Sequence, residues 1–202
     1  MSTGTSSKKG EARARLLAAA DELFYSEGIH TVGIDRVIER AGVAKGSLYY
    51  IFGSKEELVR QYLEGRHGRW TNRVEEGIAK QDDPIERLLA TYDTLDELFD
   101  EPDFQGCAFI KASAEAEEGS VEQLGNLSFR KWLDDLFFGL ATEAHVRTPK
   151  LVGRQLVMLY DGAVLSDLDG VNRPGKIAKD MARSLIAADP SWQVTAELVA
   201  GS

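Results

Sequence analysis

Apolar residues recur at helical spacing along almost the whole chain, and this pattern limits the possible folds more than any other feature. Leu16, Ala20, Leu23 and Phe24 fall on one helical face, and the pattern stops at Gly28. Glycine suits the left-handed backbone position just past a helix end. No segment shows the sustained alternation of apolar and polar residues that indicates a half-buried strand. The sequence therefore predicts an all-α protein.

Capping residues and helix breakers divide this pattern into nine predicted helices. Asp83-Pro84 marks one start, because proline is tolerated at the first helical position, and Ser54 with Glu57 forms a capping box. The first helix is expected to end before Gly28. The others are expected to cover approximately 34–41, 45–52, 54–80, 84–99, 106–118, 121–145, 149–168 and 174–188.

Composition limits both the cellular compartment and the binding partners to be expected of this chain. The single cysteine excludes a disulfide framework, no apolar run reaches the length of a membrane-spanning helix, and the polar first ten residues lack a secretory signal. We therefore expect a cytoplasmic protein. The net charge is −9, yet residues 1–60 carry nine basic and eight acidic residues, which leaves 15 and 25 for residues 61–202. Such an acidic body repels DNA, so any contact with DNA must be confined to the first 60 residues.

The second and third predicted helices are separated only by a few residues around Gly42, which is the layout of a helix-turn-helix. If Leu48 and Phe52 face the core, the short third helix turns Lys45, Ser47, Tyr49 and Tyr50 outward. Lysine and hydroxyl groups suit contacts to DNA phosphates and base edges, and a glycine at position 46 permits close approach to the duplex. This segment is therefore predicted to bind DNA.

The run AGVAKGSLYYIFGSKEEL, preceded by RLLAAADELFYSEGIHTVGIDRVIER, resembles the DNA-binding head of TetR-family transcriptional regulators over about residues 12–60. Residues 106–117 and 155–165 resemble segments of that family's ligand-binding body more weakly. The resemblance implies a nine-helix, Ω-shaped homodimer that binds a near-palindromic operator and releases it when a small ligand enters the body. On this basis residues 1–10 are expected to be a flexible tail and 11–54 the DNA-binding domain. Residues 55–190 are expected to bind the ligand and dimerise, and 191–202 to form a second tail.

The resemblance, together with the helix-turn-helix pattern, assigns a set of candidate DNA contacts. They are Thr31, Gly33, Arg36, Lys45, Gly46, Ser47, Tyr49, Tyr50 and Lys55. Two departures matter: Val32 and Gly33 stand where the family often has hydroxyl residues, and Ala44 replaces a frequent serine. Thr31 is the candidate substitute for the lost hydroxyl, and Lys45 is expected to carry more of the contact. Lys8, Lys9, Arg13 and Arg15 could add backbone contacts as an arm, the alternative being a disordered tail.

Aromatic and polarizable side chains of the expected ligand-binding domain, residues 55–190, are candidates for lining a pocket between helices. For each of them the alternative is ordinary packing in the core. They are Phe99, Phe104, Cys107, Phe109, Trp132, Phe137 and Tyr160. This lining predicts a mostly apolar or aromatic effector. Cys107 is expected to act as a small buried hydrophobe rather than as a redox sensor, because no cationic residue adjoins it.

The eighth and ninth predicted helices are expected to pair across a two-fold axis. Candidate interface residues are Leu156, Leu159, Ala163, Ile177, Met181 and Leu185.

The sequence predicts neither an enzyme nor a cofactor or metal site. It contains no glycine-rich phosphate loop and no GxSxG motif, and its three histidines are scattered. The expected function is that of a ligand-responsive repressor acting on a double-stranded operator. A transcriptional activator, or an all-helical small-molecule binding protein, remains the alternative.

Overall fold

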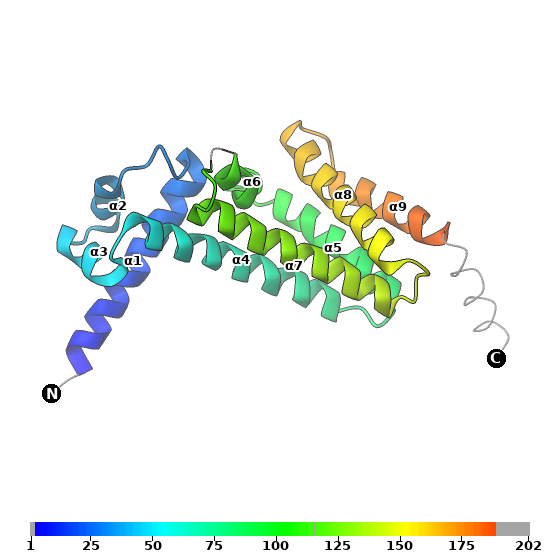
Figure 1. Cartoon of the computed structure of the whole chain (residues 1–202), viewed down its shortest axis with the longest axis horizontal. Coiled ribbons are helices and arrows are strands. Elements are labelled where there is room, and N and C mark those ends of the chain that lie inside the picture. The colour runs from blue at the N-terminus through cyan, green and yellow to red at the C-terminus, as the bar shows by residue number, and fades with distance from the viewer. Residues whose placement is uncertain (1–2, 115, 189–202) are drawn as a thin grey trace. The chain divides into compact units, whose positions relative to one another are not determined.

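The computed structural model describes residues 3–114 and 116–188, and over these ranges it contains nine α-helices and no strand (Figure 1). The helices are α1 (Thr3–Glu27), α2 (Ile34–Ala41), α3 (Lys45–Phe52), α4 (Lys55–Ala79), α5 (Pro84–Phe99), α6 (Ala108–Ser113), α7 (Val121–Glu143), α8 (Pro149–Leu168) and α9 (Pro174–Ala187). The all-α prediction is therefore confirmed. Within the described residues, no helix is both long enough and apolar enough to cross a bilayer.

Most helix ends lie where the local sequence signals place them. Gly28 and Gly42 follow α1 and α2 with φ angles of 92° and 61°. The Asp83 carboxylate accepts hydrogen bonds from the first free N–H groups of α5, and Ser54 Oγ accepts one from Glu57 N–H. These caps satisfy backbone donors that have no partner inside the helix. The exception is α6, which is shorter at both ends than the predicted 106–118; at its start, Gly106 adopts φ 93° outside the helix.

The described residues form two compact units, and the division differs from the predicted boundary at residues 54 and 55. The first unit comprises Met1–Gly68 with Cys107–Leu127, and the second comprises Arg69–Gly106 with Ser128–Ser202. In the first unit, Lys111 of α6 donates a hydrogen bond to the Tyr25 carbonyl at 2.7 Å. Arg66 of α4 donates to both oxygens of Asp21 at 2.8 and 3.0 Å. These contacts tie α6 and the start of α4 to α1, so neither belongs to a separate body.

The predicted flexible tail over residues 1–10 also differs from the structure, in which α1 begins at Thr3. The segment contains no proline, and its two glycines, Gly4 and Gly10, lower helix propensity without excluding a helix. The predicted second tail, 191–202, lies outside the described residues.

The core of the first unit lies between α1, α2, α3 and the start of α4. Leu16, Ala20, Val37, Leu48 and Leu58 are completely buried. The rings of Phe24 and Tyr62 meet edge to face, with centroids 5.6 Å apart. This burial joins the three amino-terminal helices into one body, on which the segments around α2 and α3 are held.

The core of the second unit is organised around α5, which packs on α8 and α9. Tyr92 is fully buried, and its hydroxyl donates to the Leu156 carbonyl at 2.9 Å. The Phe137 ring stands between Tyr92 and Tyr160, with centroid distances of 5.8 and 6.1 Å. Burial raises the pKa of the Tyr92 hydroxyl well above its usual range, so this group stays neutral.

A carboxylate on α5 caps α9 from outside that helix. Asp96 is 6% exposed, and its two oxygens accept hydrogen bonds from the N–H groups of Gly175 and Lys176 at 2.8 and 3.0 Å. A Cβ atom at position 175 would lie 2.5 Å from Asp96 Oδ1 and 2.7 Å from the Tyr92 carbonyl oxygen. Only glycine therefore allows the start of α9 to approach α5 this closely.

We predict that Gly175→Ala destabilises the protein by about 2 kcal/mol, because the added methyl group forces α9 away from its cap. Gly139→Ala is the matched control: it lies within α7 with nothing within 4 Å of the added Cβ. That substitution should stabilise the protein by about 0.5–1 kcal/mol through helix propensity. Urea unfolding followed by circular dichroism measures both changes, and equal changes in the two variants would contradict the capping arrangement.

Candidate nucleic-acid interface

A tight turn at Gly42 connects α2 to α3. The Gly42 N–H donates to the Glu39 carbonyl at 3.0 Å, and the Val43 N–H donates to the Ile38 carbonyl at 3.3 Å. The Arg15 guanidinium of α1 donates to the Gly42 carbonyl at 3.0 Å. The turn is therefore fixed by hydrogen bonds from both α2 and α1, and it sets the direction in which α3 leaves.

The two faces of α3 have opposite exposure. Leu48 and Phe52 are 0% and 5% exposed, whereas Tyr49 and Tyr50 are 47% and 74% exposed. Lys45 and Gly46 are also exposed, and Ser47 is half-buried. The faces of α3 are therefore oriented as the sequence predicted. Two tyrosine rings standing in solvent contribute little to the core, which marks this face as a surface available to a partner.

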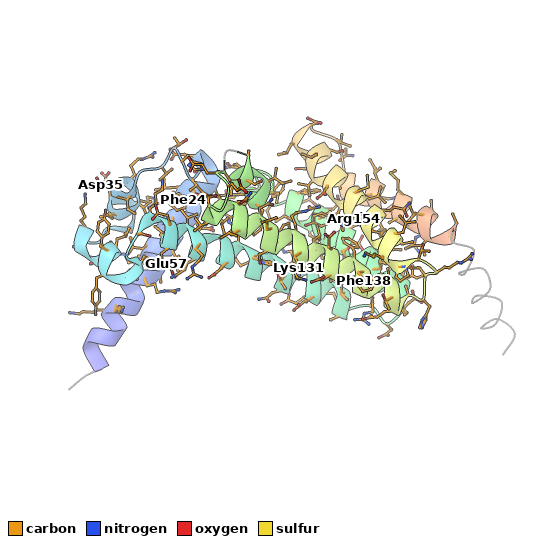
Figure 2. All side chains as sticks on the ribbon, in the orientation of Figure 1. Phe24, Asp35, Glu57, Lys131, Phe138 and Arg154 are labelled. Atoms are coloured by element: carbon orange, nitrogen blue, oxygen red, sulfur yellow. The ribbon has the colours of Figure 1, made fainter. Side chains whose placement is uncertain are left out.

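The cations carried by α2 and α3 themselves, Arg36, Arg40 and Lys45, are each held by a carboxylate. The Lys45 ammonium lies 2.8 Å from Asp35, which projects from the outer surface of α2 (Figure 2). Arg36 donates to both oxygens of Glu27 at 2.5 and 3.0 Å. The hydrogen bond from Lys45 to Asp35 raises the pKa of the lysine, so the lysine carries its full charge. All these side chains are substantially exposed, so each ion pair is weak and can be exchanged for a phosphate.

Lys55 is placed differently from the sequence expectation. Its ammonium donates to the carbonyl oxygens of Ile29 and Val32, both at 2.7 Å. Burial lowers the pKa of the lysine, while the nearby carboxylates of Glu122 and Glu56 raise it. The side chain thus fastens the loop before α2 to the start of α4. A phosphate contact by this ammonium would require those two hydrogen bonds to break, so only the backbone N–H groups at this helix end remain as candidates.

Thr31 and Gly33 both lie at the exposed start of α2. Gly33 is the N-cap, with φ −75° and ψ 153°, and no side chain caps the helix. Nothing lies within 4 Å of a Cβ atom built at position 33, so a serine would fit there without strain. The departure from the family's usual hydroxyl residue therefore removes a side-chain contact without changing the backbone.

The sequence left open whether Lys9 belongs to a DNA-contacting arm or to a disordered tail, and the structure places it in α1. The Lys9 ammonium stands over the Tyr50 ring, 4.6 Å from its centroid, which is the geometry of a cation–π contact. The part of α1 around Lys9 therefore lies beside the exposed face of α3. The signal available in the sequence was the absence of proline before residue 12, which lets α1 begin early.

The predicted ligand-binding residues are divided between the two units. Cys107 and Phe109 belong to the first unit, where Cys107 is a half-buried N-cap of α6 rather than a fully buried hydrophobe. Phe137 and Tyr160 are buried in the core of the second unit. The remaining three are half-buried residues of the second unit, namely Phe99, Phe104 and Trp132. All three are aromatic side chains that are partly accessible to solvent.

The predicted interface residues on α8 and α9 also fall into two groups. Leu156 and Ala163 are 0% and 3% exposed within a single protomer, so they belong to its own core and that part of the interface prediction is wrong. Leu159 and Leu185 are half-buried. Ile177 and Met181 are 49% and 53% exposed and remain candidates.

Comparison with known proteins agrees with the helix-turn-helix geometry. The family model described as bacterial regulatory proteins, tetR family, matches residues 16–62, which include α2 and α3. The HTH-type transcriptional activator FasR of Mycolicibacterium smegmatis is 35% identical over 102 residues, covering 50% of this chain and 46% of that protein. The HTH-type transcriptional repressor NemR of Escherichia coli K12 is 31% identical over 110 residues, covering 52% and 54%. The matches thus span about half the length of these curated relatives.

Similarity to solved structures extends over most of the chain. The TetR-family transcriptional regulator SCO4454 of Streptomyces coelicolor superposes with a TM-score of 0.81 at 28% identity, covering 89% of this chain and 96% of that one. The reduced form of Escherichia coli NemR has the same fold, with a TM-score of 0.74 at 22% identity and coverage of 89% and 98%. The turn at Gly42, the two-faced α3 and these similarities together place the chain in the TetR family of bacterial regulatory proteins.

Proposed function

We propose that the protein is a ligand-responsive transcriptional regulator whose α3 enters the DNA major groove. The observation that carries this proposal is the exposed face of α3, where Lys45, Tyr49 and Tyr50 stand in solvent while Leu48 and Phe52 fix the helix to the core. A lysine and two tyrosine hydroxyls provide phosphate and base-edge contacts. The acidic excess of residues 61–202 disfavours contacts of that part of the chain with phosphate, which supports a DNA contact within the first 60 residues.

We infer that it acts as a repressor. A repressor needs only to occupy its operator and to leave it when an effector binds, and both steps use parts already described. The chain offers α4 as the connection between them, since this helix contributes residues to both units. Activation is the second candidate, because FasR is named an activator whereas NemR is named a repressor.

The proposed functional form is a homodimer built on α8 and α9. Leu151, Met158 and Leu165 are 58%, 66% and 51% exposed and recur every seven residues, so they form one stripe along α8. Gly162 lies in the same stripe and has nothing within 4 Å of a built Cβ, which leaves room for a second helix to approach. The neighbouring helix α9 (Figure 1) adds the exposed Ile177 and Met181. A second copy would cover both apolar surfaces, and the resulting dimer would carry two α3 helices, as a protein that contacts two successive major grooves about 34 Å apart requires.

The proposed effector has a mostly apolar or aromatic body. Its support is the set of half-buried aromatic side chains in the second unit, Phe99, Phe104 and Trp132. Apolar and aromatic walls with a few polar groups are the usual lining of small-molecule sites.

The proposal is tested by selecting genomic DNA fragments with the purified protein and, in parallel, with a Lys45→Ala variant. Enrichment of a short inverted repeat by the parent, and its loss in the variant, would support a DNA-reading regulator and identify its neighbouring genes. No enrichment by the parent at low salt would overturn the proposed function.

Removing Lys45 or the Tyr49 hydroxyl should weaken operator binding. For Lys45→Ala we expect a loss of at least tenfold, and a salt slope reduced by about 2 because each of two protomers loses one phosphate contact. Tyr49→Phe should cost a smaller, several-fold loss. Fluorescence anisotropy with a labelled operator measures both. Lys131→Ala is the matched control, since Lys131 forms a comparable exposed ion pair with Asp135 in the second unit; an equal loss in this control would refute the assignment.

Neutralising the carboxylate that holds Lys45 should have the opposite effect. We expect Asp35→Asn to tighten operator binding several-fold at low salt, because it frees the lysine and removes a charge that repels phosphate. The gain should shrink as salt is added. Asp135→Asn, which releases Lys131 in the second unit, should change nothing. Weaker binding by Asp35→Asn would show that the ion pair positions Lys45 rather than competes for it.

A charge placed in the α8 stripe should separate the protomers. Met158→Glu is expected to convert the dimer to a monomer, because the carboxylate would lose its hydration inside an apolar interface. Light scattering after size exclusion gives the mass of each species. Leu124→Glu, at a residue of α7 with similar exposure of 56%, is the control and should remain dimeric. A parent protein that is monomeric at micromolar concentration would contradict the proposed interface.

A further inference from the structure

Two buried hydrogen-bond donors on α4 have no partner among the described residues. They are the indole Nε1 of Trp70 and the guanidinium Nη1 of Arg73. Trp70 is only 9% exposed. The two residues are three apart on one helix, so their side chains leave the same face of α4. The second unit therefore contains a pair of adjacent donors that its own fold does not satisfy.

Such a pair requires an explanation, because buried polar groups in folded proteins are almost always hydrogen-bonded. An indole N–H can only donate, so an acceptor must come from outside the described side chains. A guanidinium likewise has donors only. Both groups therefore require the same kind of hydrogen-bond acceptor, an oxygen or nitrogen atom with a free lone pair.

The surroundings of Arg73 connect these donors to the half-buried aromatic rings. The other terminal nitrogen of Arg73 forms an ion pair with Glu101. The Glu101 carbonyl accepts a hydrogen bond from Phe104 N–H at 3.0 Å, and the Phe104 ring lies 5.1 Å from that of Phe99. Glu101 thus connects Arg73, whose Nη1 has no hydrogen-bond partner among the described residues, to two aromatic rings that are partly accessible to solvent. Because Glu101 already balances the charge of Arg73, the missing acceptor can be a neutral carbonyl oxygen as well as a carboxylate.

We propose that Trp70 and Arg73 form the polar end of a small-molecule site, where they donate hydrogen bonds to an oxygen acceptor carried by an apolar or aromatic ligand. The regulatory meaning of this site rests on the proposed function, since the ligand would be the effector. Its binding chemistry rests only on the donors and on the rings of Phe99 and Phe104. The ligand class is therefore an apolar body with one carbonyl or carboxylate group.

The test compares three ligands of similar size that differ in the acceptor: 2-naphthoate, 2-acetylnaphthalene and 2-ethylnaphthalene. Their affinities for the full-length protein are measured by calorimetry without DNA. The variants are Trp70→Phe, which keeps an aromatic ring but removes the donor, and Arg73→Met. Arg87→Met is the matched control, because Arg87 is 36% exposed and paired with Glu143, whereas Arg73 is 34% exposed and paired with Glu101.

We expect the parent and Arg87→Met to bind both oxygen-bearing probes at least tenfold more tightly than 2-ethylnaphthalene. Trp70→Phe and Arg73→Met should each reduce this preference to below threefold. The inference is overturned if no probe binds, if the hydrocarbon binds as tightly as the other two, or if the preference survives in Trp70→Phe. Survival there would mean that the donors serve only a buried water. Because no DNA is present, this result is independent of whether the parent selects an operator.

Discussion

An eight-residue helix has almost no stability of its own in water, so α3 exists only because Leu48 and Phe52 are buried against the rest of the first unit. That burial determines which side of α3 faces solvent, and hence which side chains a partner meets. The turn at Gly42, held by the Arg15 guanidinium, fixes the direction of the helix. The proposed DNA-reading surface is thus a consequence of packing on α1 and α2 rather than a property of α3 alone.

Electrostatics then restricts what this surface binds. The chain carries an excess of acidic residues, and even Arg36 of α2 and Lys45 of α3 are held by the carboxylates of Glu27 and Asp35. Exposed pairs of this kind contribute little stability, so a phosphate can replace the carboxylate at small cost. If α3 binds DNA as proposed, a ligand that reaches several of these cations together gains more than one that reaches a single cation, because each displaced carboxylate is replaced by a phosphate.

The fold and the faces of α3 could be predicted from the sequence because their signals are local. Gly28, Gly42, Ser54 and Asp83 mark helix ends through backbone and capping chemistry, and the spacing of Leu48 and Phe52 defines a buried face.

The misassigned residues depend on long-range packing, which spacing does not encode. Lys55 turns back to the Ile29 and Val32 carbonyls, and only the folded loop places those acceptors within its reach. Helix α8 carries apolar residues on two faces, so periodicity alone did not separate the buried Leu156 from the exposed Met158. The unpartnered donors of Trp70 and Arg73 likewise become visible only once burial is known.

The most direct measurement of the central claim, that α3 reads the major groove, is dimethyl sulfate protection of guanine N7 on an operator bound by the protein. Guanine N7 lies in the major groove, so α3 inserted there must shield it. The account predicts two protected patches whose centres are about one helical turn apart, both lost with Lys45→Ala. Unprotected N7 atoms in a fully bound operator, or a single patch unaffected by Lys45→Ala, would contradict it.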